Sequence, residues 1–296
     1  MQEGKSFGRS PELTALHKEH LPPFLHRAHE RARQIVDCEA IDIDSFQGIY
    51  DEGRLAKARR YVGDRQNTFA IQAEQVPQLK EFFMLGESLE GFFHDQINTG
   101  ALFGPNAVGM KTSKYDDIAH GVDEVVVFHD PEGSAFTGLA VDFTFGTSGR
   151  GKLHRKIEEA IRDAQDGTLA RIEYCRLKTG SLDIEGEIRV PRVVVGSEKK
   201  HAIELLGLWM SESGEKLAGH PYQMLLLREI LDQLDVLGTI APSATRGHYR
   251  SAHGRFEKVL KEKQARGLSM GSLRDDAVYQ NIRETMSHVL NSSGGR

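Results

Sequence analysis

Apolar residues recur at helical spacing through the segment from Val76 to Thr99. This spacing predicts a helix with one apolar face that packs on the rest of the protein. At 100° per residue, Glu90 falls at the edge of that face and Glu87 just beyond it. A carboxylate at a buried edge either has a charged partner or reaches water along its aliphatic stem, because desolvating it alone is costly. The apolar positions are Leu79, Phe82, Phe83, Leu89, Phe93 and Ile97.

The pattern changes after this helix from helical spacing to short β-branched runs. Glycines punctuate the polar stretch from Phe103 to Gly121, which predicts a loop. The runs Val122 to Phe128 and Leu139 to Phe145 predict two strands. Their connection, HDPEGSAFTG, contains the proline, glycine and serine typical of turns, so we expect the two strands to form a hairpin.

The remaining chain alternates between helical and extended patterns. A helix is predicted from Lys152 until Gly167 ends it, and two more helices span His201 to Met210 and Pro221 to Leu237. Further strands are predicted at Leu169 to Leu177 and Ile188 to Val195. The order predicts an α/β fold with a mixed central sheet flanked by helices. We divide the chain into an N-terminal helical region (1–75), an α/β core (76–240) and a C-terminal helical, basic segment with a tail (241–296).

The composition is that of a globular protein. Of the 296 residues 39% are apolar and 27% are charged, which excludes a mostly disordered or low-complexity chain. No apolar run approaches the ~18 to 20 residues that span a bilayer, and the first residues lack the apolar stretch of a signal peptide. We therefore expect a cytoplasmic protein without a membrane partner. Cys38 and Cys175 are too few for a disulfide framework or a four-cysteine zinc site.

Charge is distributed unevenly along the chain. Residues 1–150 hold 15 Lys and Arg against 23 Asp and Glu, whereas the rest of the chain holds 23 against 20. The basic excess lies after Pro242, and such a stretch either binds a phosphate backbone or is a solvated terminal segment. The candidate nucleic-acid contacts are Arg246, Arg250, Arg255 and Lys258, together with Lys114 in the central loop.

Acidic residues occupy unusual positions in the predicted hairpin. Asp123 opens the first strand, and Asp142 interrupts the apolar run of the second, where aspartate is disfavoured. If the strands pair as neighbours, the two carboxylates meet at the same end of the hairpin. Converging carboxylates need a counter-charge, and a divalent cation with oxygen ligands is the usual one. Taken alone, Asp123 is equally well explained as a turn cap.

An acid on a helix is followed by an Asp at a strand start and, 19 residues later, by an acid in the paired strand. A helix and another strand come next. This order resembles that of the PD-(D/E)XK nuclease superfamily. The resemblance covers residues 76–195 and rests on Glu87 or Glu90, Asp123 and Asp142. It implies a restriction-endonuclease-like core whose carboxylates bind Mg²⁺ or Mn²⁺. A bound cation of this kind lowers the pKa of a water and stabilises charge on a phosphoryl group.

The sequence departs from the family at the lysine that acts on the attacking water. In the family this lysine stands two positions after the second acid, where this chain has Thr144. Threonine holds a water by hydrogen bonds but brings no positive charge. Either another cation replaces the lysine, with Lys152 and Lys156 on the following helix as the first candidates and Lys114 as another, or the site is catalytically inactive.

Three functions follow from this reading. The first is a metal-dependent nuclease that hydrolyses phosphodiester bonds, with DNA favoured over RNA. The second is an inactive protein of the same fold that binds nucleic acid or a protein partner, which Thr144 favours. The third is a helical interaction protein with structural acids, in which PYQMLLLREILDQLDVLG, apolar almost all round, forms a core helix or a homo-oligomer interface.

Overall fold

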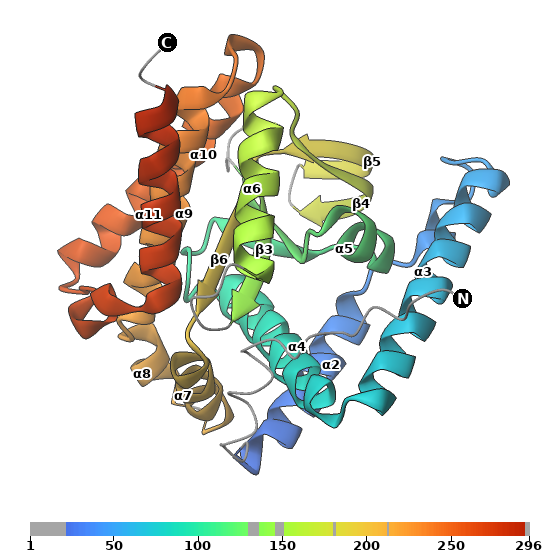
Figure 1. Ribbon diagram of the computed structural model, residues 1–296, viewed down its shortest axis with the longest axis horizontal. Coiled ribbons are helices and arrows are strands. Elements are labelled where there is room, and N and C mark those ends of the chain that lie inside the picture. Colours follow the sequence, from blue (N-terminus) through green and yellow to red (C-terminus); the bar gives the residue numbers. More distant parts are fainter. Residues whose placement is uncertain (1–21, 130–135, 146–150, 180–181, 212, 294–296) are drawn as a thin grey trace, which may run out of the picture.

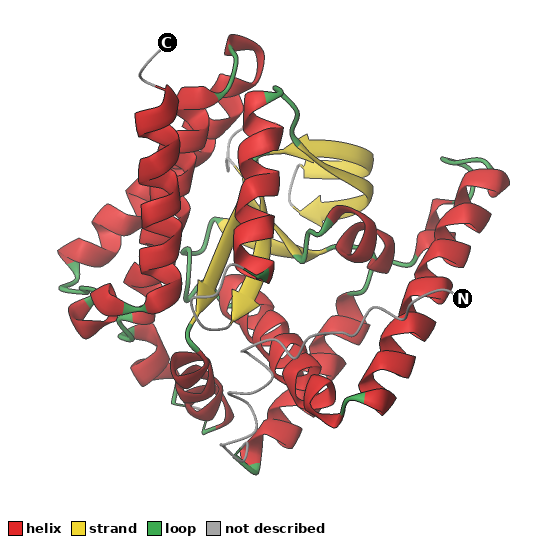
Figure 2. Cartoon of the chain, viewed as in Figure 1, coloured by secondary structure: helices red, strands yellow, loops and turns green. Residues whose placement is uncertain are grey.

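A four-stranded mixed sheet lies at the centre of the molecule, and helices cover it (Figures 1 and 2). The computed structural model describes residues 22–129, 136–145, 151–179, 182–211 and 213–293. The sheet has the order β1-β2-β3-β6, in which the first three strands are antiparallel and β6 is parallel to β3. The predicted α/β fold with a mixed sheet flanked by helices is confirmed at this level. The strands are β1 (Ala107–Lys111), β2 (Glu124–His129), β3 (Phe136–Phe145) and β6 (Arg192–Ser197).

Apolar clusters cover both faces of the sheet. One face packs with α4, α7 and α9 in the largest apolar cluster, where the Phe93 and Phe143 rings stack with centroids 4.3 Å apart. On the other face α6 packs through Leu153 and Ile157 against Val194 of β6, with α11 beside it. Successive residues of a strand point to opposite faces, so Phe143 enters the large core while Asp142 faces α6. The helices are α4 (Pro77–Asn98), α6 (Lys152–Gln165), α7 (Lys199–Met210), α9 (Tyr222–Ile240) and α11 (Ala277–Ser293).

The hairpin of β2 and β3 and the helices α4 and α6 agree with the sequence-based expectation. The loop expected between α4 and β2 is wrong, because this segment forms β1 and the short helix α5 (Lys114–His120). The single strand expected over residues 188–195 is also wrong. Pro191 has no backbone N–H and separates β5 (Leu182–Val190) from β6, and β5 pairs with β4 (Ala170–Thr179) in a separate two-stranded sheet.

The terminal helices pack onto the central sheet and its covering helices. Leu25, Ala28 and Ala32 of α2 are fully buried in the same cluster as α4. At the other end α10 lies along α9, and Phe256 of α10 packs edge-on against Phe128 of β2. None of the helices in the described ranges is both long and apolar enough to cross a bilayer. The other elements are α2 (Phe24–Glu39), η1 (Ile43–Phe46), α3 (Glu52–Gln75), α8 (Gly214–Ala218), α10 (Ser243–Ala265) and η2 (Gly271–Asp275).

Candidate functional site

The register of the hairpin brings Asp123 and Asp142 together, as the sequence predicts. Glu124 of β2 pairs with Val141 of β3, which places Asp123 beside Asp142 at one end of the two strands. Both side chains are buried, with 7% of Asp123 and 2% of Asp142 exposed. The backbone N–H of Phe143 donates to Asp123 Oδ2 over 2.7 Å, which fixes the first carboxylate against the second strand.

A lysine of α6 supplies the counter-charge. The Lys156 ammonium donates to Asp142 Oδ1 and to the carbonyl oxygen of Phe143, the latter over 3.1 Å. Lys156 is 6% exposed because it lies within the face of α6 that packs on the sheet. Lys152, one turn earlier, is exposed and contributes to the site only a longer-range positive charge near Asp123. Of the three lysines that the sequence left open, Lys152, Lys156 and Lys114, the structure brings Lys156 to the carboxylates.

Thr144 lies two residues beyond Asp142, at the position of the family's lysine. It pairs with Gly196 of β6, and its methyl group occupies the space where a side chain at Gly196 would stand. Its hydroxyl forms no hydrogen bond with the described residues. The positive charge next to Asp142 therefore comes from the helix and not from the strand.

A second buried lysine, Lys111, was missed because β1 was not predicted. Its ammonium donates to the carbonyl oxygen of Asp123 over 2.8 Å and lies 3.8 Å from Glu90 Oε2 and 3.6 Å from Glu124 Oε2. Glu90 projects from α4 at the edge of its apolar face, as expected, and keeps 26% of its side chain exposed. We call Glu90, Asp123 and Asp142 the acid cluster. The Lys111 ammonium contacts the Glu90 carboxylate and the backbone of Asp123.

Glu124 connects the acid cluster to a buried histidine. Glu124 is fully buried, and its Oε1 lies 2.8 Å from His94 Nδ1. The second ring nitrogen of His94 lies 2.9 Å from Glu39 at the surface. Burial alone would lower the pKa of His94, but the Glu124 carboxylate outweighs it and the net shift is upward. A β-carbon at Gly109 would come within 2.5 Å of Glu124 Oε1, so this pair needs glycine at that position of β1.

The three carboxyls of the acid cluster differ in pKa. Burial, reinforced by the charge of Asp123, raises the pKa of Glu90 to about 8. Burial also raises the pKa of Asp142 to about 7, although Lys156 opposes the shift. Burial would raise the pKa of Asp123 as well, but Lys156 and Lys111 together outweigh it and the pKa is lowered. Near neutral pH the cluster therefore holds one ionised carboxylate and exchangeable protons on the other two.

The aspartates have oxygens to offer a cation. Asp123 Oδ2 accepts the N–H of Phe143 and Asp142 Oδ1 accepts the Lys156 ammonium, and the two carboxyls also share a hydrogen bond with each other, whose proton a cation would replace. Hard carboxylate oxygens suit Mg²⁺ or Mn²⁺, and Mg²⁺ is commonly held by one or two carboxylates with waters in its other positions. The two aspartates fit this pattern directly. Glu90 is the third carboxylate near them, and the charge of Asp123 acts on it directly.

Two other residues predicted for the site lie apart from the aspartates. Glu87, the alternative to Glu90, pairs with His29 of α2 over 2.7 Å, and 54% of its side chain is exposed. Lys114 lies at the rim on α5, where it pairs with Asp117 over 3.0 Å. The choice between the two glutamates of α4 therefore falls on Glu90.

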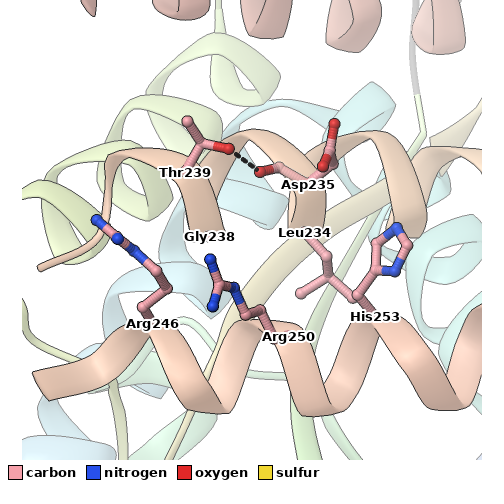
Figure 3. A pocket seen from close by; sticks show the side chains of 7 residues that line it. All are labelled: Leu234, Asp235, Gly238, Thr239, Arg246, Arg250 and His253. Atoms are coloured by element: carbon pink, nitrogen blue, oxygen red, sulfur yellow. Dashed lines mark hydrogen bonds between the residues drawn. The ribbon is translucent and has the colours of Figure 1, made fainter. Parts of the chain in front are cut away.

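The basic residues of α10 line a separate pocket of about 300 Å³ between α9 and α10 (Figure 3). Arg246 donates through two nitrogens to the carbonyl oxygen of Ala241, and Arg250 and His253 follow it along the helix. Gly167, which follows α6, contacts Pro242, whereas Lys156 is near the start of α6. Lys156 and Gly167 are eleven residues apart, which corresponds to ~16 Å along the axis of α6. Predicted contacts Arg255 and Lys258 lie farther along α10, so all four belong to a surface remote from the acid cluster.

A second group of ionisable side chains, Glu198, His201 and Asp276, has ligand atoms within 4.8 Å of one another. Asp276 Oδ1 accepts the N–H groups of Val278 and Tyr279 at the start of α11. Its Oδ2 accepts the N–H of Glu198 and lies 2.7 Å from His201 Nδ1. These contacts cap α11 and join it to the turn after β6, which gives the group a structural role.

Comparison of the chain with protein-family models, with curated proteins and with solved structures found no match. The functional conclusion therefore depends on the geometry of the acid cluster and its two lysines.

Proposed function

We propose that this protein is a metal-dependent nuclease that hydrolyses phosphodiester bonds. The observation that carries the proposal is the meeting of Asp123, Asp142 and Lys156, which come from a strand start, a strand interior and a helix. A surface salt bridge would need no such burial, and a structural ion pair would need only one carboxylate. Of these two adjacent carboxyls, Asp142 keeps an exchangeable proton near neutral pH, and a divalent cation can take the place of that proton.

The order of elements supports the resemblance to the PD-(D/E)XK superfamily. Helix α4 with Glu90 precedes three antiparallel strands, and α6 and a strand parallel to β3 follow them. Thr144, in place of the lysine that the resemblance implies, favoured an inactive protein. Lys156 weakens this argument against catalysis, because its ammonium contacts Asp142, the acid that the lysine would follow by two positions.

The residues have distinct roles in this proposal. Asp123 and Asp142 would hold the divalent cation, which supplies a water of lowered pKa and stabilises charge on the phosphoryl oxygens. Lys156 stays charged, because the neighbouring aspartates raise its pKa despite burial. It is placed to hold the attacking water by a hydrogen bond and to stabilise the negative charge that develops as the bond to the leaving oxygen breaks. Lys111 keeps the backbone of Asp123 and the Glu90 carboxylate in place.

Cleavage of single- and double-stranded DNA and RNA with Mg²⁺ or Mn²⁺ tests the proposal. We expect metal-dependent cutting that is lost in Asp142→Asn and falls by about 10²- to 10³-fold in Lys156→Gln, by analogy with the loss of one charge-stabilising donor. Lys152→Gln, one turn away and exposed, is the matched control and should retain activity. An absence of cutting on every substrate would refute the nuclease. If salt-sensitive binding then survived in Asp142→Asn, the inactive nucleic-acid-binding protein would take its place.

A further inference from the structure

A pocket of about 280 Å³ lies between α3, α5 and β4. Three tyrosines line it, Tyr61 from α3, Tyr115 from α5 and Tyr174 from β4, and these three elements lie side by side (Figure 1). Arg54, Lys57 and Glu173 complete the wall. We call this site the tyrosine pocket.

The tyrosine rings form walls at steep angles instead of a closed stack. The Tyr115 ring meets Tyr61 at 68° with centroids 5.8 Å apart, and it meets Tyr174 at 88° with centroids 5.5 Å apart. Tyr61 is among the few large apolar side chains that are exposed, at 39%. Aromatic rings prefer offset-stacked or edge-to-face partners, so the exposed ring of Tyr61 suits a flat ring that enters the pocket.

The polar groups of the tyrosine pocket suit a ligand with a negatively charged backbone. The Glu173 carboxylate is neutralised by two arginines, Arg54 and, over 3.1 Å, Arg171. Lys57 is exposed and forms no ion pair with any residue that the structure describes, so its charge is free to meet a phosphate. The buried hydroxyl of Tyr174 lies near Glu173 but makes no well-aligned hydrogen bond within the described chain.

Helix α5 connects the tyrosine pocket to the acid cluster. At its C-terminal end, a β-carbon at Gly121 would lie 4.0 Å from Asp142 Oδ2, and Arg192 donates to the carbonyl oxygen of His120 over 2.6 Å. The His120 ring meets the Tyr115 ring edge-on with centroids 5.5 Å apart. Gly121 and Tyr115 are six residues apart, or ~9 Å along the helix axis. This separation is within the length of a few nucleotides of single strand.

We propose that the tyrosine pocket binds an unstacked base of single-stranded nucleic acid, with Lys57 on the adjoining phosphate. Stacking of bases on aromatic side chains and a basic rim are the general means by which proteins hold single strands without reading their sequence. A paired base is not free to enter such a pocket. The placement of this base next to the scissile bond rests on the proposed nuclease function, but its binding in the pocket does not.

Binding measured in EDTA separates the two proposals, because no metal-dependent cleavage occurs there. The probes are a short thymidine strand and a strand of the same length made only of abasic sites, which carries the same phosphates. We expect the protein to bind the thymidine strand more tightly and to quench 2-aminopurine placed within such a strand. Tyr61→Ala should weaken thymidine binding by about 5- to 150-fold, the effect of losing one stacked base, and leave abasic binding unchanged.

Two variants control for the ring and for the helix. Tyr61→Phe keeps the ring and should bind like the wild type, and Ile71→Ala removes another exposed apolar side chain of α3 outside the pocket. Equal binding of both strands by the wild type, or equal effects of Tyr61→Ala on both, would overturn the pocket even if the protein cuts nucleic acid. Preference for the thymidine strand, together with no metal-dependent cleavage of any substrate by the wild type, would uphold the pocket and refute the nuclease.

Discussion

Replacing Asp142 with asparagine should change the stability of the metal-free protein increasingly in favour of the variant as the pH rises. Burial and the neighbouring Asp123 raise the pKa of Asp142 from 3.8 to about 7. A carboxyl whose pKa is raised by folding binds its proton more tightly in the native state, so it destabilises the protein progressively above pH ~4. The loss is complete above pH ~7, where a shift of about three units corresponds to about 4 kcal/mol.

The pH dependence isolates this effect from other consequences of the substitution. Urea unfolding in EDTA at pH 5 and at pH 8 gives the stability difference between Asp142→Asn and the wild type under both conditions. Any altered contact with Lys156 enters at both pH values, so the change between them reports ionisation, which we expect to favour the variant by about 2 to 3 kcal/mol. Asp183→Asn is the control, because Asp183 lies on β5 with 66% of its side chain exposed.

A stability difference that stays flat from pH 5 to pH 8 would refute this account of the acid cluster. It would mean that the Asp142 carboxylate is already balanced by Lys156 when ionised. Asp142 would then have no exchangeable proton, and the electrostatic reason for a further cation beside it would disappear.

Two further predictions concern the cation and the packing around the acid cluster. Binding of Mn²⁺ should release protons and tighten as the pH rises through 7 to 8, because Asp142 and Glu90 must ionise to accept it. Calorimetry in buffers of different ionisation enthalpy measures the number of protons released. Binding that is independent of pH and releases no proton would contradict this prediction. Gly109→Ala should destabilise the protein to urea unfolding by about 1 to 3 kcal/mol, because its β-carbon would lie 2.5 Å from Glu124 Oε1. The control is Gly63→Ala in the open middle of α3, which should stabilise the protein by about 0.5 to 1 kcal/mol. Equal effects of the two substitutions would show that the contact at Glu124 is not tight.

Local patterns predicted the elements that carry the two aspartates. The β-branched runs and the turn residues between them were sufficient for the hairpin, and the period of two then placed Asp123 beside Asp142. By contrast, β1 is five residues long and contains Gly109, so its strand conformation comes from pairing with β2 and was not evident locally. Lys111 was missed for that reason.

The choice of lysine on α6 was open from the sequence, although a signal for it existed. Lys156 is three residues after Leu153 and four before Ala160, both buried, so it falls inside the apolar face of the helix. Lys152 falls outside that face. A lysine within an apolar face needs a carboxylate partner, and Asp142 was the acid already without an explanation in the sequence. The buried Lys156 and the buried Asp142 therefore account for each other, but only the packing of α6 on β3 and β6 brings them into contact.

Phe143 explains how a fold tolerates buried acids at this place. Its ring stacks on Phe93 in the largest core, while its N–H binds Asp123 and its carbonyl oxygen binds Lys156 on the opposite face. The apolar contacts of one face therefore fix the backbone that organises the charges of the other. Such a site is held in place by a core that does not titrate, so its carboxyls can exchange protons for a cation without the strand moving. This separation of rigidity from charge is what the proposed hydrolytic function would require of the site.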